Sequence, residues 1–167
     1  MAQKVGIGSD HAGFEAKEAI KKFLDDEGIE FVDFGTFSKD SCDYPDYARK
    51  VAESVSSGEC GRGILCCGSG IGVSIVANKV RKVRAALCHD VESATLSRQH
   101  NDSNVICFSA RTTRPDQINA MLKAWFATEF EGGRHKTRVD KIEKPRAGEE
   151  ATAGAHEGET QSWYSIH

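Results

Sequence analysis

The sequence predicts an α/β fold: a doubly wound, three-layer α/β/α (Rossmann-like) domain around a five-stranded parallel sheet. Two observations lead to this prediction. Short apolar runs alternate along the chain with longer stretches in which apolar residues recur every three or four positions, which is the period of an amphipathic helix. No hairpin signal stands between successive apolar runs, so we expect parallel strands covered by helices on both faces.

The individual elements follow in order from these patterns. Apolar runs predict strands at residues 4–8, 29–34, 62–66, 83–88 and 104–108. Helical periodicity predicts helices over residues 14–28, 45–55, 90–100, 115–126 and 134–144, and another that opens within 68–79. Pro45 suits a first helical turn because it has no amide hydrogen to leave unpaired. Asp90 is expected to cap the helix that follows it.

Length and charge predict one domain with an acidic extension. The chain has 167 residues and a formal net charge of −3. Four acidic residues and no Lys or Arg fall within 147–167, which leaves 22 basic and 21 acidic residues in 1–146. We therefore expect one domain over residues 1–146 and a disordered acidic tail over 147–167.

The same arithmetic excludes several classes of protein. A body charge of +1 is too small for a protein whose main task is to bind nucleic acid. No apolar run approaches the ~20 residues that a bilayer requires. The first residues, MAQKVGIGSD, lack the apolar stretch of a signal peptide. We expect a cytoplasmic protein with no nucleic-acid or membrane partner.

The chain contains six cysteines, at positions 42, 60, 66, 67, 88 and 107. In a reducing compartment they are expected to be free thiols. No C-x-x-C pair and no Cys–His set at zinc-finger spacing occurs, so no metal site is expected. All of them except Cys67 are expected to pack as small buried hydrophobic residues.

Open parallel sheets bind their ligands at the carboxyl ends of the strands, and a glycine-rich loop, CCGSGIG at 66–72, follows the third strand. Its glycines let backbone amides approach a ligand. The spacing does not match dinucleotide or Walker-type phosphate loops, so stabilisation of a reaction oxyanion is the better interpretation. Cys67 either serves as a thiolate favoured by these amides or packs beneath the loop. Ser69 either caps the helix or binds a substrate oxygen.

Two polar sets and one basic stretch complete the candidates. An Asp-His pair at 10–11 follows the first strand, and a His-Asn-Asp set at 100–102 ends the helix before the fifth. Arg134 and Arg138 are four residues apart on one helix face, which suits a phosphate group. The alternative is an ordinary solvated helix face.

Six segments, in chain order, are GSDHAGFEAK, DYPDYA, CCGSGIGVSIVANK, RAALCHD, SRQHNDSNVICF and GGRHKTRVDKI. They resemble those of the ribose-5-phosphate isomerase B family, which also includes the subunits of galactose-6-phosphate isomerase. The resemblance covers about residues 4–145. A cysteine directly before the G-S-G loop, with Val73 after its last glycine, is similar to the branch of the family that uses a cysteine base.

This resemblance implies that the protein interconverts D-ribose 5-phosphate and D-ribulose 5-phosphate through an enediolate, in the pentose phosphate pathway, without a cofactor. It also implies a homodimer, sometimes paired into a tetramer, with sites at the subunit interface. The implied catalytic residues are Cys67 as base, His100 and Asp10 in ring opening, and Ser69 at the enediolate. The implied substrate-binding residues are His11, Asp43, Tyr44, Gly68, Gly70, Ile71, Gly72, Asn101, Arg111, Arg134 and Arg138.

Two other functions compete with this one. A six-carbon aldose phosphate could be absorbed by a slightly longer pocket, although the chain keeps the His-Asn-Asp set that the galactose-6-phosphate subunits tend to lose. A non-catalytic sensor of a phosphorylated metabolite would need the glycine loop and the arginines. It would have no use for Cys67 together with His100, so the isomerase is the leading prediction.

Overall fold

The computed structural model describes residues 4–144, and the tail expected over 147–167 lies outside the described residues. Five strands form a single parallel sheet, which confirms the predicted fold class. They are β1 (Val5–Ser9), β2 (Phe31–Asp33), β3 (Arg62–Cys67), β4 (Ala85–Leu87) and β5 (Val105–Ser109), in the order β2-β1-β3-β5-β4.

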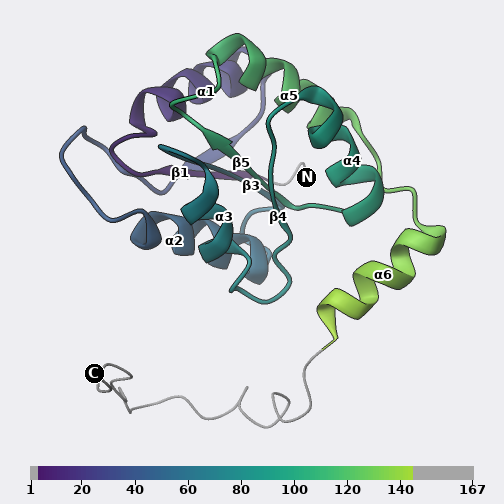
Figure 1. Cartoon of the computed structure of the whole chain (residues 1–167). Coiled ribbons are helices and arrows are strands. Elements are labelled where there is room, and N and C mark those ends of the chain that lie inside the picture. Colours follow the sequence, from purple (N-terminus) through teal and green to yellow (C-terminus); the bar gives the residue numbers. More distant parts are fainter. Residues whose placement is uncertain (1–3, 145–167) are drawn as a thin grey trace, which may run out of the picture.

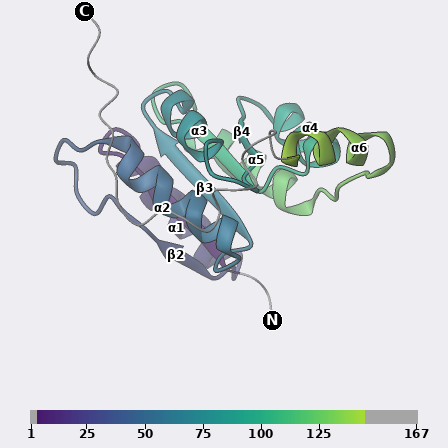
Figure 2. The same ribbon diagram turned by 90° about the horizontal axis from the view of Figure 1, so that it is seen from below.

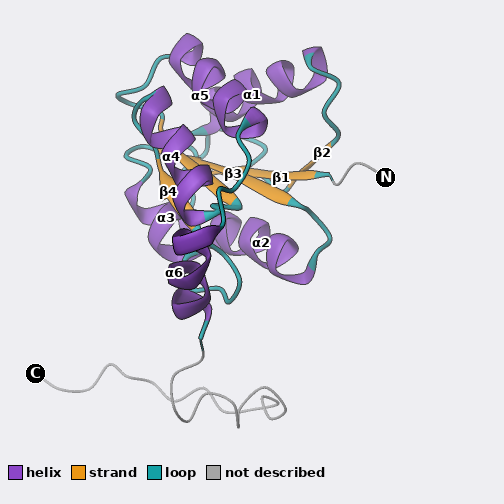
Figure 3. Ribbon diagram, turned by 90° about the vertical axis from the view of Figure 1, so that its right-hand side faces the viewer, coloured by secondary structure: helices purple, strands orange, loops and turns teal. Residues whose placement is uncertain are grey.

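Helices cover both faces of this sheet (Figures 1 and 3). One layer holds α1 (Phe14–Asp26), α4 (Val91–Asn101) and α5 (Pro115–Ala127), and the other holds α2 (Tyr44–Ser57) and α3 (Ile71–Ala77). Pro45 lies in the first turn of α2, and the Asp90 carboxylate caps α4 by accepting the Ser93 N–H at 2.7 Å, both as predicted. Among the helices of residues 4–144, none is long and apolar enough to cross a membrane.

The alternation of side chains along the central strand divides the core in two. Ile64 and Cys66 of β3 pack with α1, α4 and α5, whereas Leu65 and Cys67 pack with α2 and α3. Consecutive strand residues point to opposite faces of a sheet, so one continuous apolar run serves both cores. The order of the strands reverses direction between β1 and β3, and this is the position at which doubly wound sheets bind ligands.

The two edge strands, β2 and β4, are shorter than predicted, with three residues each. Only some of their flanking groups continue the ladder, such as the Phe34 N–H, which donates to the Ile7 carbonyl at 2.9 Å. The Ile29 N–H bonds instead to the Leu24 carbonyl at the end of α1, at 2.8 Å. The Arg84 N–H donates to the Asn104 side chain at 2.8 Å. Turn and loop contacts therefore take over part of the backbone that periodicity alone would place in the ladder.

The last helix, α6 (Gly133–Glu143), projects from the body beside α4 (Figures 1 and 2). Arg84, just before β4, holds it through an ion pair with Glu143. The same guanidinium donates to the Asn101 and Asp102 carbonyls at 3.0 Å and pairs with the Asp102 carboxylate at 3.1 Å. One side chain therefore joins the end of α4 to the end of α6.

Candidate active site

The carboxyl ends of β1, β3 and β5 lie side by side and carry the first group of predicted site residues. Ser9 pairs with Cys66, and Cys67 pairs with Ser109. Beyond the ladder, the Ala110 N–H bonds to the Cys67 carbonyl at 2.9 Å and the Arg111 N–H to the Gly68 carbonyl at 3.2 Å. These backbone bonds draw the loops after β3 and β5 together above the end of the sheet.

The Cys67 thiol lies at the base of this group. Its side chain ends β3, is 4 % exposed, and its Sγ accepts the Gly70 N–H at 3.1 Å. A backbone donor aimed at sulfur stabilises the negative charge of a thiolate more than the neutral thiol. The loop after β3 therefore places a backbone hydrogen-bond donor on the Cys67 sulfur at the end of the sheet.

The other cysteines divide into two kinds. Burial raises the pKa of the Cys60, Cys66 and Cys107 thiols and that of Cys88 to about 11, so these four remain neutral packing residues. Cys42 does not fit the expectation of a buried hydrophobic residue. It is half-buried in the loop before α2, and its Sγ lies 3.9 Å from His11 Nδ1.

Each glycine of the loop meets a neighbour at close range. A Cβ on Gly70, whose φ is +74°, would lie 2.5 Å from Leu87 and 2.8 Å from the Phe108 backbone. A Cβ on Gly68 would lie 3.0 Å from the Arg111 guanidinium, and one on Gly72 would lie 2.7 Å from the Tyr44 ring. The small residues thus let two predicted substrate-binding side chains, Arg111 and Tyr44, lie directly against the loop.

Ser69 and Ile71 occupy the exposed rim of the loop. Gly70, and not Ser69, is the N-cap of α3, and no side chain caps this helix. The Ser69 Oγ accepts the Ile71 N–H at 3.3 Å from one position earlier, and its hydroxyl proton can still donate. The Ile71 side chain is 54 % exposed. The N–H of Gly72 lies in the first turn of α3, where backbone donors have no partner within the helix.

The Asp-His pair lies beside this loop at the end of β1. Asp10 is buried, and its carboxylate accepts the Gly13 N–H at 2.9 Å. The exposed His11 accepts the Cys42 N–H on Nδ1 at 3.2 Å, which leaves its Nε2 free for a ligand. Asp43 precedes α2 without capping it, so its exposed carboxylate is also available.

A second group lies at the amino end of the sheet. His100 and Asn101 end α4, just before β5 begins. The His100 ring stacks on the His135 ring of α6, with centroids 4.2 Å apart. Arg134 and Arg138, also on α6, are exposed and form no ion pair within the described residues. This end therefore presents two unpaired guanidinium groups beside a pair of imidazoles.

His135 is the residue of this group that pattern reasoning missed. It is 5 % exposed and packs against α4 together with Val139, four residues later. Burial lowers the pKa of its imidazole, and the neighbouring His100 and Arg134 lower it further. The i, i+4 spacing of His135 and Val139 could have indicated a buried stripe on α6, but the charged residues around them hide it.

The two groups do not meet within one chain. Between the Gly63–Val105 and Cys67–Ser109 pairs the ladder advances four residues, at about 3.3 Å each, so about 13 Å of strand separates the two ends. Cys67, Asp10 and the glycine loop lie at one end, and His100, Asn101 and the α6 arginines lie at the other. A site that uses both groups requires two copies of the chain.

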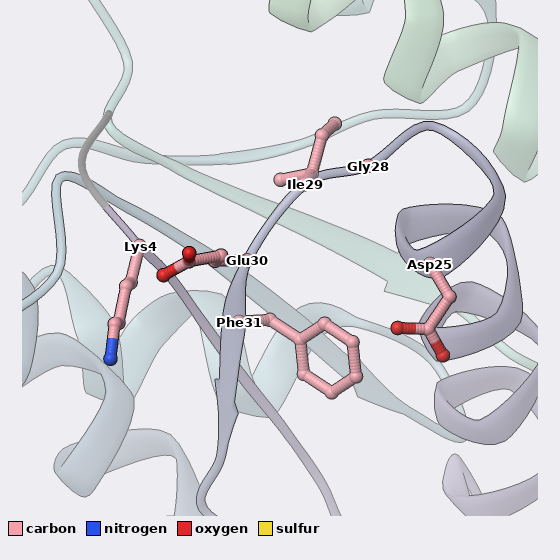
Figure 4. A pocket seen from close by; sticks show the side chains of 6 residues that line it. All are labelled: Lys4, Asp25, Gly28, Ile29, Glu30 and Phe31. Atoms are coloured by element: carbon pink, nitrogen blue, oxygen red, sulfur yellow. The ribbon is translucent and has the colours of Figure 1, made fainter. Parts of the chain in front are cut away.

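Pockets of the described residues lie on other parts of the surface than the carboxyl-end group. One of about 460 Å³ lies beside the amino ends of β1 and β2, where Lys4, Glu30 and Asp25 flank Phe31 (Figure 4). Its lining includes no residue of the carboxyl-end group. A smaller pocket of about 250 Å³ borders the second group and is lined in part by Asn101 and Arg84.

Comparison with known proteins places these features in context. Residues 5–142 match the family model described as Ribose/Galactose Isomerase. A putative sugar phosphate isomerase of Bacillus subtilis is 50% identical over 140 residues, covering 83% of this chain and 94% of that protein. Ribose-5-phosphate isomerase B of Escherichia coli is 45% identical over 140 residues, covering 84% and 94%.

Solved structures agree with these matches. The structure of ribose-5-phosphate isomerase B from Clostridium thermocellum superposes with a TM-score of 0.83 and 50% identity, over 84% of this chain and 95% of that one. The type B ribose 5-phosphate isomerase of Trypanosoma brucei gives a TM-score of 0.83 and 46% identity, over 86% and 98%.

Proposed function

The chain belongs to the ribose/galactose isomerase family, and from this premise we propose that it interconverts D-ribose 5-phosphate and D-ribulose 5-phosphate with Cys67 as the catalytic base. The observation that carries the proposal is the Gly70 N–H aimed at the Cys67 sulfur at the carboxyl end of the sheet. The four thiols whose pKa burial raises cannot take this role, because they stay protonated.

In the proposed reaction, His100 of one copy, assisted by Asp10 of the other, moves the protons that open the furanose ring. The Cys67 thiolate then removes the proton from C2 of the open-chain aldose. The C–H electron pair becomes the C1–C2 double bond, and the C1 carbonyl oxygen becomes the oxyanion of an enediolate. A proton passes from O2 to O1, and the Cys67 thiol returns its proton to C1 to give the ketose.

The geometry refines the role of each loop group in this scheme. The Gly70 N–H donates to the Cys67 sulfur, so in this scheme it stabilises the base. The donors that stabilise the oxyanion are then the Gly72 N–H, the Ser69 hydroxyl and the Asn101 side-chain amide. Loss of such a donor typically costs ~10²–10³-fold in rate. Gly68 admits Arg111 to the site, and Tyr44 forms its wall over Gly72.

The separation of the two groups supports a dimer as part of the proposal. Cys67 and Asp10 of one copy would combine with His100, Asn101, Arg134 and Arg138 of the other, in the isologous arrangement that a two-fold axis produces. Ile71 and Ile75, which are 54 % and 55 % exposed on α3 beside the glycine loop, form apolar surface that such a partner would cover. The proposal therefore includes two sites for each dimer.

Charge supports a phosphorylated substrate. Arg111 and His11 come from the carboxyl-end group, and the exposed Arg134 and Arg138 come from the amino-end group of the partner copy. Converging guanidinium groups bind a phosphate dianion through several charge-assisted hydrogen bonds. The phosphate would then anchor the sugar at the boundary between the two copies.

The direct test is turnover by the purified full-length chain. We expect ribulose 5-phosphate to form from ribose 5-phosphate without any added cofactor, and more slowly, if at all, from allose 6-phosphate or galactose 6-phosphate. Faster turnover of a six-carbon sugar would change the proposed substrate. No turnover of any of the three would overturn the proposal.

A further inference from the structure

Three side chains with metal-binding chemistry gather where α4 meets α6. A ring nitrogen of His100, a carboxylate oxygen of Glu131 and a ring nitrogen of His135 all lie within 4.8 Å of one another. The sequence alone did not bring these residues together, because they lie at the end of α4, in the connecting loop and at the start of α6.

The backbone holds the three residues in place. The Glu131 N–H donates to the Gln99 carbonyl at 3.1 Å, which fixes the loop directly beside His100. The His135 N–H donates to the Gly132 carbonyl at 3.0 Å in the first turn of α6. The two imidazoles stack with their planes 6° apart, and Glu131 Oε2 lies 3.5 Å from His135 Nε2. The backbone therefore keeps the three residues adjacent. Because the nearly parallel rings direct their lone pairs side by side, one imidazole must turn out of the stack before both can bind one ion.

Two imidazoles and one carboxylate form a ligand set that favours Zn²⁺ and similar divalent transition ions. Metal–ligand bonds of about 2.0–2.2 Å place tetrahedral ligand atoms roughly 3.3–3.5 Å apart, so binding requires the ligand atoms to approach by up to about 1.5 Å and one ring to turn. Glu131, whose side chain is 49% exposed, and the partly exposed His100 are the residues that can move.

The neighbouring charges set the strength of such a site. Arg134 Nε lies 3.5 Å from His135 Nε2 and opposes a cation, whereas the Glu131 carboxylate favours one. A permanent structural ion is therefore not expected. The balance fits an ion that binds and leaves as its concentration changes.

We propose that Zn²⁺ binds reversibly to His100, Glu131 and His135 and inhibits the enzyme. The inhibition, though not the binding, rests on the proposed function, in which His100 moves protons during ring opening. An imidazole whose lone pair is bound to a metal ion cannot accept a proton. The ion would thus compete with catalysis at the same side chain, and Glu131 would be a ligand used only for inhibition.

Binding is tested without reference to activity, with Co²⁺ as a spectroscopic substitute for Zn²⁺ and titration calorimetry with Zn²⁺ itself. The full-length protein is expected to bind one ion per chain, with cobalt ligand-field bands and no thiolate-to-cobalt charge-transfer band. Glu131→Gln should weaken binding by about tenfold or more. Glu129→Gln, an exposed acid two residues earlier in the same loop, is the matched control and should bind as the wild type does.

The second arm measures turnover at increasing Zn²⁺. Wild type and Glu129→Gln should be inhibited at the same Zn²⁺ concentration. Glu131→Gln should keep its basal activity and should need a Zn²⁺ concentration about tenfold higher, or more, for the same inhibition. A thiolate charge-transfer band, or equal binding by both variants, would overturn the metal site. If Co²⁺ binding depends on Glu131 but the chain isomerises no sugar phosphate, the metal site stands and the proposed function fails.

Discussion

Cys67 and His100 lie at opposite ends of the same parallel sheet. Cys67 is the last residue of β3, and His100 lies at the end of α4, which returns to the amino end before β5 starts. Arg84, which precedes β4 at that amino end, bonds to the carbonyls of the two residues after His100. Both side chains can act on one substrate only if each site takes one of them from each copy.

Mixing two inactive variants tests this arrangement. Cys67→Ala and His100→Asn should each lose activity alone. When the two are unfolded, mixed in equal amounts and refolded, half of the dimers are mixed, and each mixed dimer has one site with both native side chains. We expect about a quarter of the wild-type turnover to return. If mixed dimers are shown to form but no turnover returns, each chain forms its own site.

The vicinal cysteines provide an internal comparison for the base. Cys67→Ala should reduce kcat by about 10²–10⁴-fold, the usual contribution of a general base, while phosphosugar binding is largely retained. Cys66→Ala should keep activity and lose about 1–2 kcal/mol of unfolding free energy, because Cys66 is fully buried in the opposite core. Steady-state kinetics and urea unfolding measure the two effects. The reverse pattern would assign the base to Cys66.

Gly70 is predicted to tolerate no side chain. Its φ is +74°, and an added Cβ would lie 2.8 Å from the Phe108 backbone, which cannot move without disturbing β5. Gly70→Ala should shift the loop, withdraw the N–H from the Cys67 sulfur and reduce turnover by at least about tenfold. Gly58→Ala is the control. Its φ is +83° with no atom within 4 Å, so only about 1 kcal/mol of stability should be lost and kcat should be unchanged.

Much of the fold could be predicted because each element has its own local signal. The alternation in β3 separates Cys66 from Cys67, and turn residues mark the ends of α1 and α2. The lateral order of the strands could not be predicted, since β5 inserts between β3 and β4 without any trace in the apolar pattern. Side-by-side pairing of buried parallel strands depends on packing between distant segments, which periodicity does not record.

The placement of the candidate site residues in the fold was predictable only in part. The carboxyl-end residues follow strands directly, so the rule for parallel sheets brings Asp10, Cys67 and Arg111 together. Cys42 and His135 could not be found this way. The position of Cys42 depends on a long loop that folds back onto His11. The position of His135 depends on the packing of α6 against α4. Both are tertiary contacts between segments whose own patterns are weak.

Arg84 is predicted to position the amino-end group without touching substrate. Arg84→Met removes its bonds to Asn101, Asp102 and Glu143. We expect a loss of about 2–3 kcal/mol in stability and faster proteolysis of α6, because hydrogen bonds to charged groups are each worth about 1.5–3 kcal/mol. The Michaelis constant for the phosphosugar should rise more than kcat falls, since α6 carries the two arginines.

Arg81→Met, a change at an exposed position three residues earlier, is the control for this prediction. It should leave both kinetic constants unchanged. Arg84→Lys should recover little, because an ammonium group cannot reproduce the planar fork that reaches two carbonyls and two carboxylates. Full recovery in Arg84→Lys would indicate that only its charge matters.

The ion pair between the buried Lys17 and Asp33 makes the free energy of unfolding depend on pH. Its Nζ lies 2.6 Å from Asp33 Oδ2, with Lys21 2.9 Å from the same oxygen. Burial opposes ionisation of Asp33, but hydrogen bonds from both lysines outweigh it and hold the pKa of this carboxyl below its ordinary value. A carboxyl with a lowered pKa in the folded state stabilises the fold above its unfolded pKa of about 3.9. That contribution disappears as the pH falls through the lower, folded pKa.

Asp33→Asn should therefore be less stable than wild type at pH 7, by about 3–5 kcal/mol, because it leaves the Lys17 charge buried without this partner. The difference in unfolding free energy from wild type should narrow as urea unfolding is repeated at pH values from about 3.9 downwards, because the wild type loses the contribution of the Asp33 charge as the pH falls towards the lower, folded pKa. Lys17→Met combined with Asp33→Asn should recover part of the loss at pH 7, because methionine fills the space without a charge. A double variant no more stable than Asp33→Asn would show that Lys17 is compensated by Glu18, whose carboxylate lies 2.9 Å away.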